Sequence, residues 1–310
     1  MNKSVLCIGA TLVDELYFCE QQCIPNTSNP ATKTTSIGGV ISNIAQHLGL
    51  LQLQPSLLTA LGSDADADYI IKNLNQKGIT LNQSIIADTS TGKYVSILHP
   101  DGSLFVAVCQ DISSTYLTPT FLATKIDFIK TFDLVIIDTN IPAESIQWLI
   151  DFTKTHQQKL IIEPVSVIKG SKLVPLNLEG VFMITPNEDE LTAIANIDAT
   201  NETTLVESLF RRGVQQVWVR KGNQGSVMHS PTQSLTLGVP KIDIVDSTGA
   251  GDAALAGWVF GYLNKENETT CLQLAHTLAL EVLQTKGAVV QTINCNNLYQ
   301  IKNTYYNEHQ

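Results

Sequence analysis

Residues 246–258 read Asp-Ser-Thr-Gly-Ala-Gly-Asp-Ala-Ala-Leu-Ala-Gly-Trp, and this stretch decides the fold. The apolar alternation of residues 239–245 predicts a strand before it. The almost uniformly apolar residues 253–263 predict a buried helix after it. Between them, Gly249-Ala250-Gly251 is a turn of small residues, which lets the backbone approach a ligand closely.

The start of this helix is a predicted anion site, because its first N–H groups lack helical partners and the helix dipole is positive there. Asp252 lies at this site. Compensation of the dipole alone would explain an aspartate in a first helical turn. Phosphoryl transfer needs the same parts: amides that stabilise charge on the phosphate, and a carboxylate that takes the proton of the attacking hydroxyl.

Two familiar phosphate-binding motifs do not account for the turn. The chain contains no Gly-x-x-x-x-Gly-Lys-Ser/Thr string, which excludes a Walker A loop. Gly257 comes too late to be the third glycine of a dinucleotide-binding Gly-x-Gly-x-x-Gly. An ordinary strand-to-helix turn and a different kind of phosphate site both remain open at this point.

Composition limits the class of protein. The chain has 310 residues, 44% of them apolar and 15% charged, as expected of a globular chain and not of a disordered one. Its net charge of −10 disfavours a nucleic-acid partner, which would need a basic face. No apolar run reaches about 20 residues, so no membrane span is expected, and the N-terminal apolar run is too short for a signal peptide. We therefore expect a cytoplasmic protein.

The six cysteines are scattered and form no Cys-x-x-Cys pair. A zinc site would need tighter clustering, so buried free thiols are expected.

Strands and helices alternate along most of the chain. Short apolar runs predict strands, and longer periodic runs predict the helices between them. Such alternation favours a mostly parallel sheet, whose strands carry ligands at their carboxyl ends. The strands are expected at 4–10, 56–60, 133–138, 160–162, 182–184 and 217–220, and the helices at 40–50, 67–77, 144–155 and 271–283.

Two segments interrupt this alternation. Residues 91–110 predict a hairpin, because alternating residues flank the turn Pro100-Asp101-Gly102-Ser103. Residues 16–37 are polar and favour extended structure.

Several polar residues follow predicted strands and are candidates for binding. Asp14 is either a turn residue or a hydrogen-bond acceptor. Gly38 and Gly39 are either a simple helix-start turn or a place where a ligand meets the backbone, with Asn43 one turn inside the helix. Asn140, after the strand at 133–138, is a candidate by position alone.

Two stretches together resemble a known family. Residues 246–252 resemble the C-terminal signature of the ribokinase-like (PfkB) sugar and nucleoside kinases, and residues 38–45 resemble its N-terminal signature. The resemblance implies one kinase domain over residues 1–310, of α/β class. Its fold would be a three-layer sandwich with a central, mostly parallel sheet. Insertions at about 14–37 and 91–110 would form a small β-sheet lid over the substrate, which would exclude water.

The resemblance also implies roles for residues at the site. Asp252 would be the general base, with Gly249, Ala250 and Gly251 as the anion hole. The sugar would be held by a set of residues from the first strand and the glycine turn, namely Asp14, Gly38, Gly39 and Asn43. The cofactors implied are ATP, Mg²⁺ and K⁺.

For the nucleotide, residues 187–190 resemble the family's Asn-x-x-Glu motif and 221–225 its Gly-x-x-Gly loop. Asn187 and Glu190 would organise Mg²⁺ through its waters, although the same pair could simply cap a helix. Lys221 either faces phosphate or is a solvated loop residue. The remaining implied contacts with the nucleotide or a monovalent cation come from Gly222, Gly225, Gly287 and, for the cation, Asp246.

Shorter segments resemble one branch of the family, the bacterial pseudouridine kinases. They are residues 28–30, 38–46, 138–141, 163–166 and 185–188. This resemblance implies transfer of the ATP γ-phosphate to the 5′-hydroxyl of pseudouridine, with Asn140 near the base or ribose. A kinase for another nucleoside or ribose, and an inactive nucleoside- or sugar-sensing protein, are the alternatives. Open lid edges favour pairing into a homodimer.

Overall fold

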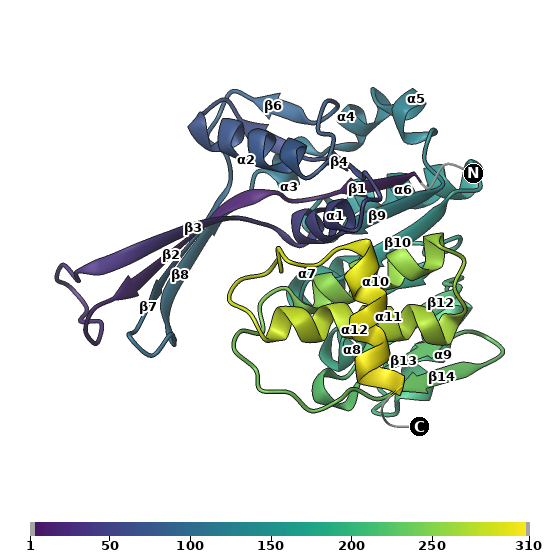
Figure 1. Ribbon diagram of the computed structural model, residues 1–310. Coiled ribbons are helices and arrows are strands. Elements are labelled where there is room, and N and C mark those ends of the chain that lie inside the picture. The colour runs from purple at the N-terminus through teal and green to yellow at the C-terminus, as the bar shows by residue number, and fades with distance from the viewer. Residues whose placement is uncertain (1–3, 308–310) are drawn as a thin grey trace.

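A computed structural model of the chain, described here for residues 4–307, has an α/β body and a second sheet that stands out from it (Figure 1). Parallel pairing runs through the central sheet from β12 to β4, and β13 and β14 add an antiparallel edge. The predicted mostly parallel sheet is therefore confirmed. In spatial order its strands are β14 (Ser234–Leu237), β13 (Ser226–His229), β12 (Gln216–Arg220), β11 (Met183–Ile184), β10 (Lys159–Glu163), β9 (Leu134–Asp138), β1 (Val5–Ile8) and β4 (Ser56–Leu58).

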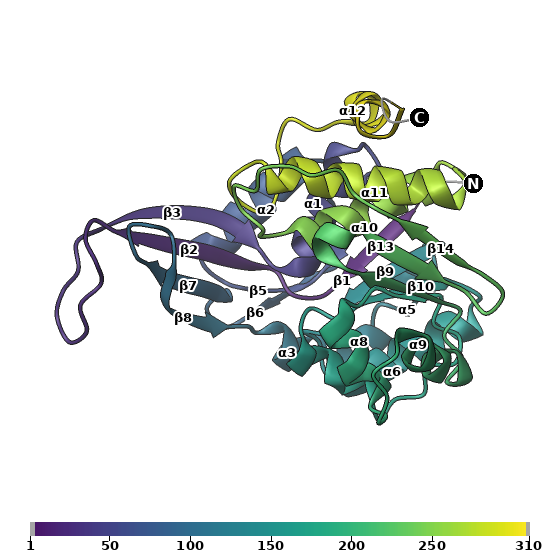
Figure 2. The same cartoon turned by 90° about the horizontal axis from the view of Figure 1, so that it is seen from below.

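Helices cover both faces of this sheet, which gives the three layers (Figures 1 and 2). Successive side chains of a strand point to opposite faces. Val5 and Cys7 accordingly belong to one buried cluster, and Leu6 and Ile8 to the other. The first cluster contains side chains of α1 (Val40–Leu50), α2 (Ala65–Gln76), α10 (Ala250–Leu263), α11 (Glu268–Leu283) and α12 (Cys295–Asn307). The second contains side chains of α4 (Pro119–Ala123), α5 (Ile126–Ile129), α6 (Ala143–Thr155), α8 (Glu188–Ala195) and α9 (Glu202–Arg211).

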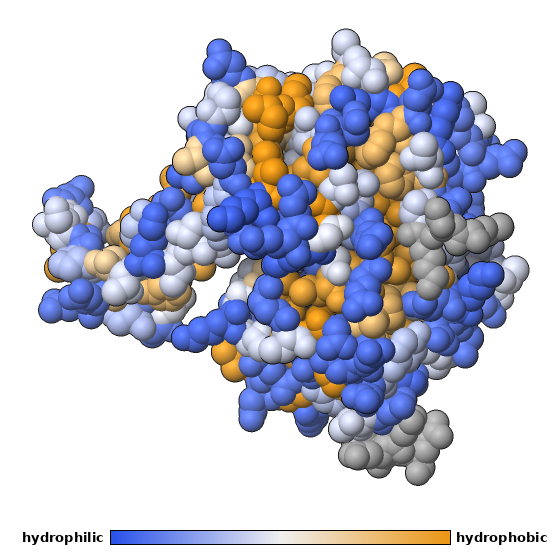
Figure 3. All heavy atoms as spheres, turned by 45° about the horizontal axis from the view of Figure 1, so that its top comes forward, coloured by the Kyte–Doolittle hydropathy of each residue, from blue (hydrophilic) through white to orange (hydrophobic). Residues whose placement is uncertain are grey.

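The lid predicted from the two insertions is present as a separate sheet. Its strand order is β3 (Ala31–Gly38), β2 (Leu12–Cys19), β7 (Lys93–Leu98) and β8 (Leu104–Gln110). Because β2 begins soon after β1 ends, the lid is connected to the body at the carboxyl end of a central strand. It extends from the body as an arm, which the space-filling view shows on the left (Figures 1 and 3).

The strand expected at residues 239–245 is wrong. This segment has no regular structure, and Ile244 and Val245 are more than half exposed. Pro240 has no N–H for a ladder, and β14 already forms the edge of the sheet. The apolar alternation therefore had no neighbouring strand to pair with.

The six cysteines are free thiols, as expected, but Cys109 of the lid is exposed and Cys295 is only partly buried. Within residues 4–307, no helix has the length and apolar character needed to span a membrane.

Candidate active site

The carboxyl ends of β10, β11 and β12 surround a cavity of about 260 Å³, together with the N-termini of α1 and α10. Parallel strands present ligands at this edge. The lining combines one carboxylate from a strand end, two from helix starts and a single guanidinium. The residues are Val40, Glu163, Val165, Asn187, Glu190, Arg220, Gly222, Gly251 and Asp252. The structure thus brings Asn187, Glu190, Gly222, Gly251 and Asp252 together, as the sequence predicted.

The N-terminus of α10 faces this cavity. Gly249 has φ 77°, and a β-carbon there would lie 2.5 Å from the Ala288 carbonyl oxygen, so this position requires glycine. The helical ladder begins with the bond from Ala253 N to Gly249 O, 2.9 Å long. Among the described residues, the N–H groups of Gly251 and Asp252 have no hydrogen-bond acceptor. These two donors are free at the turn where the sequence predicts an anion site.

Asp252 is a buried carboxylate at the head of α10, with 8% of its surface exposed. The Asn43 side-chain amide of α1 donates a hydrogen bond of 2.9 Å to its Oδ2. Burial raises the pKa of Asp252 to about 7, with the negative charge of Glu163 adding to the rise, while the Asn43 hydrogen bond and the positive charge of Arg220 oppose it. The carboxylate can therefore gain or lose a proton near neutral pH.

Asp14 lies where the lid joins the body. Its carboxylate packs against Gly38, where a β-carbon would lie 2.2 Å from Oδ1, and burial raises the pKa of Asp14 to about 6. Gly39 precedes α1 with φ 99°, and a β-carbon there would lie 2.2 Å from the Ala10 carbonyl oxygen. Gly38 thus lets Asp14 lie next to the start of α1, on which Asn43 lies, and Gly39 lets the Ala10 backbone lie there.

Asn140 follows β9 and is held rigidly. Its side-chain amide donates a 2.8 Å hydrogen bond to Asp138, and its Oδ1 accepts one from Lys169. Asp138 is fully buried, and burial raises its pKa to about 6. The sequence predicted Asn140 alone, whereas the structure shows a cluster of amide, carboxylate and ammonium.

Asn187 and Glu190 form a capping box at the start of α8. The Asn187 side chain accepts from Glu190 N at 2.8 Å, and Glu190 Oε2 accepts from Asn187 N at 2.9 Å. Helix capping, one of the two readings of this pair, is therefore what the structure shows. Both residues also line the cavity, so capping places the Glu190 carboxylate at the site.

The loop after β12 departs from its prediction in part. Lys221 forms a 2.6 Å ion pair with Glu202 of α9 and is not among the residues that line the cavity. Gly222 does line it. Gly225 has φ 90° and packs so closely that a β-carbon would lie 2.0 Å from the Leu237 carbonyl oxygen, which explains the glycine by packing alone.

Asp246 connects the central turn to the loop after α11. Its two oxygens accept hydrogen bonds of 2.9 Å each, from Thr248 N and from Gly287 N. Burial alone would raise its pKa, but these hydrogen bonds outweigh burial and lower it. Asp246 and Gly287 are thus brought together, with the carboxylate ionised.

Arg220 and Glu163 are site residues that sequence reasoning missed. Each is the last residue of a strand, β12 or β10, and their side chains pair at 2.8 Å. Glu163 stands within a segment compared with the family and Arg220 directly precedes another, and both lie at the carboxyl ends of strands, where ligands bind. A charged residue that ends an otherwise apolar strand was the signal that could have identified them.

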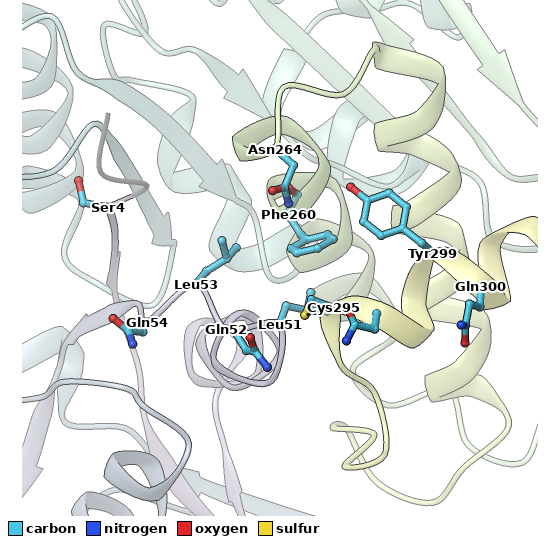
Figure 4. A pocket seen from close by; sticks show the side chains of 11 residues that line it. Ser4, Leu51, Gln52, Leu53, Gln54, Phe260, Asn264, Cys295, Tyr299 and Gln300 are labelled. Carbon is cyan, nitrogen blue, oxygen red and sulfur yellow. Dashed lines mark hydrogen bonds between the residues drawn. The ribbon is translucent and has the colours of Figure 1, made fainter.

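A second hollow, of about 1200 Å³, lies elsewhere, between the loop after α1 and the helices α10 and α12 (Figure 4). Phe260 and Tyr299 face it, and so do Leu51 and Gln54. Among its described lining residues there is no carboxylate and no cationic side chain. It lacks the groups that phosphoryl transfer requires, so the smaller cavity is the candidate active site.

The donor set at this cavity suits Mg²⁺ and not a tightly liganded metal. Within residues 4–307, no three His, Cys, Asp or Glu side chains are grouped so that they could hold an ion. Mg²⁺ keeps several waters and needs few protein oxygens, and Glu190 supplies a carboxylate here.

Comparison with known proteins identifies the family. The model of the pfkB family of carbohydrate kinases matches residues 2–294, so the chain belongs to that family. It is therefore a kinase that transfers a phosphoryl group to a hydroxyl.

Individual relatives agree with this assignment. The chain is 28% identical over 266 residues to the pseudouridine kinase of Escherichia coli, covering 83% of this chain and 84% of the relative. It is 24% identical to the ribokinase of Staphylococcus aureus, covering 86% and 88%. Arabidopsis thaliana ribokinase, solved with ribose and ATP, superposes with a TM-score of 0.85 at 20% identity, covering 97% and 99%. The ribokinase-like fold predicted from the sequence is confirmed.

The protonation of Asp252 can be measured without any substrate. We expect a carboxyl carbon titration by NMR to give a midpoint near pH 7 for Asp252. In Asn43→Ala the midpoint should rise, because the hydrogen bond that favours the charged form is lost. A midpoint near that of an exposed aspartate, or a fall in Asn43→Ala, would contradict the burial and the hydrogen bond described here.

Proposed function

We propose that this protein is an ATP-dependent kinase that converts pseudouridine into pseudouridine 5′-phosphate. One observation carries the chemistry: the buried carboxylate of Asp252 at the head of α10, hydrogen-bonded to Asn43 and facing the unpartnered N–H groups. The substrate rests on the segments that resemble pseudouridine kinases and on the relative of that name.

In the proposed reaction, Asp252 accepts the proton of the substrate's 5′-hydroxyl as its oxygen bonds to the γ-phosphorus of ATP. The bond from that phosphorus to the bridging oxygen breaks, and ADP leaves with the electron pair. The turn of Gly249, Ala250 and Gly251 stabilises the charge on the transferred group through its N–H groups. A base whose pKa lies near 7 is suited to this role at neutral pH.

The ribose is assigned to Asp14, Gly38, Gly39 and Asn43. Gly38 lets the Asp14 carboxylate lie against the start of α1, and this carboxylate can accept hydrogen bonds from hydroxyls. Asn43 is assigned to a substrate hydroxyl as well as to Asp252, because its amide nitrogen is used by Asp252 and its buried Oδ1 has no hydrogen-bond partner among the described residues. Asn140 is assigned to the base or ribose.

The nucleotide is assigned to Asn187, Gly222 and Gly287, whereas Lys221, paired with Glu202, and Gly225, held by packing, are left out of the assignment. Glu190 would hold Mg²⁺ through its water, and the ion would supply positive charge to the nucleotide phosphates. Asp246, kept ionised by its hydrogen bonds, is assigned to a monovalent cation such as K⁺.

A kinase for ribose or another nucleoside is the second candidate. The relatives that are ribokinases favour it, and the same catalytic half would serve either substrate. A sensor without catalysis is disfavoured, because a sensor has no need of a buried base at an anion site.

We further propose a homodimer that forms through the lid. Leu104, Val106 and Val108 of the edge strand β8 are exposed, and all of residues 31–36 on the opposite edge strand are exposed. Unpaired sheet edges of this kind pair with another chain.

Light scattering after size exclusion should give a molar mass twice the 33.8 kDa of one chain. The substitution Val106→Lys places a charge on the edge strand and should reduce the molar mass to that of one chain. A single chain mass in the parent protein would refute the dimer.

The function is tested by ATP consumption with Mg²⁺ and K⁺ against pseudouridine, uridine, adenosine, inosine and ribose. We expect the highest kcat/KM for pseudouridine. A preference for ribose or adenosine would agree with the proposed mechanism but would rule out pseudouridine as the main substrate. Absence of turnover on every acceptor, with nucleoside binding retained, would support the sensor instead.

Removal of the base gives a second test. Asp252→Asn should lower kcat by a factor of about 10² to 10⁴ while nucleoside binding persists, because a general base is lost and the shape is kept. Initial-rate kinetics and calorimetric titration with pseudouridine measure the two effects. Asp68→Asn, at an exposed position on α2, is the matched control and should behave as the parent. Near-normal turnover in Asp252→Asn would remove Asp252 as the base.

A further inference from the structure

The side chain of Arg220 lines the candidate active site without an assigned role. It ends β12, and only 16% of the side chain is exposed. Its Nη2 donates to Glu163 Oε1 at 2.8 Å and lies 3.8 Å from Glu190 Oε2. Glu163 is fixed in turn, because its Oε2 accepts a 2.6 Å hydrogen bond from Thr185. One edge of the guanidinium is therefore held by the protein.

The other edge of the guanidinium is directed at the head of α10. A β-carbon on Gly251 would lie 2.7 Å from Arg220 Nη1, so this nitrogen lies directly against the turn. Among the described residues, Nη1 has no hydrogen-bond acceptor. It also keeps access to the cavity, since it is not one of the buried polar atoms that lack a partner.

Burial alone would lower the pKa of Arg220, but the negative charges of Glu163, Glu190 and Asp252 raise it, so the guanidinium stays charged. Its Nη1 and the N–H groups of Gly251 and Asp252 lack a hydrogen-bond acceptor among the described residues, although they lie at the same turn. The N-terminus of a helix is positive and favours anions. An anion placed among these donors would give each of them an acceptor.

We propose that Arg220 is a catalytic residue whose Nη1 edge binds the phosphoryl group during its transfer, while Glu163 holds the opposite edge. This inference rests on the proposed kinase function and adds to the turn a charged side-chain donor. The transferred group must pass between its nucleotide and the hydroxyl that faces Asp252, and that is the space against which Arg220 lies. A guanidinium presents paired N–H donors in a plane, which suits phosphate oxygens.

Binding measurements test this proposal apart from activity. Calorimetric titration with Mg²⁺ would compare ADP with a non-hydrolysable ATP analogue that carries a γ-phosphate. In Arg220→Gln we expect affinity for the analogue to fall about tenfold or more, as for loss of a charge-assisted hydrogen bond, with ADP affinity little changed. Arg211→Gln is the matched control, since Arg211 is exposed at the end of α9.

Kinetics supply the second readout. Arg220→Gln should lower kcat about 10²- to 10³-fold, the usual effect of removing one donor that stabilises the transition state, with little change in nucleoside KM. Arg220→Lys keeps the charge but loses the paired N–H donors of the guanidinium, so its kcat should lie between those of Arg220→Gln and the parent. Adding guanidinium at millimolar concentration should partly restore Arg220→Ala, which a purely structural role would not allow.

The outcomes separate the two proposals. Equal loss of affinity for ADP and the analogue, or turnover of Arg220→Gln close to that of the parent, would overturn the role of Arg220. If Arg220→Gln does not fold, the same comparison on Arg220→Lys decides. A parent protein that phosphorylates no acceptor would refute the kinase function, while the comparison of ADP with the analogue would still decide whether Arg220 binds a γ-phosphate.

Discussion

The hydrogen bond from Asn43 to Asp252 joins the first turns of two helices that lie 209 residues apart in the sequence. It is buried, so it forms only when α1 and α10 have packed beside each other on the same face of the central sheet. Gly39 permits α1 to begin where it does, and Gly249 does the same for α10. The two glycine-rich stretches of the sequence are thus two halves of one site.

Several charged side chains near this hydrogen bond are buried. Glu163, Glu190 and Asp252 face a single guanidinium, and burial raises the pKa of Asp252 until it can act as a base at neutral pH. Val165 lines the same cavity with φ 68°, a conformation that a β-branched residue rarely adopts. The surrounding fold maintains both the excess of negative charge and the strained backbone at Val165, and both features are common at functional sites.

Much of this arrangement could be predicted from the sequence, because it depends on patterns of residues that are close together in the chain. The apolar strands, the glycine turn before Asp252 and the hairpin of the lid each have a short-range signal. The strand expected at 239–245 failed because pairing depends on a neighbour that a local pattern does not reveal. Arg220 and Glu163 were missed for a related reason: their importance lies in the pairing of two strand ends 57 residues apart. Lys221 is of a residue type that can bind phosphate, but in the structure its ammonium group pairs with Glu202 of α9.

The central claim is that a substrate hydroxyl meets Asp252 at the head of α10. A crystal structure with pseudouridine, Mg²⁺ and a non-hydrolysable ATP analogue would test it most directly. We expect the 5′-oxygen within about 3.2 Å of an Asp252 carboxylate oxygen, in line with the γ-phosphorus and near the N–H groups of Gly251 and Asp252. A nucleoside bound with its 5′-oxygen beyond the reach of Asp252, or nucleotide phosphates bound away from this helix end, would contradict the account.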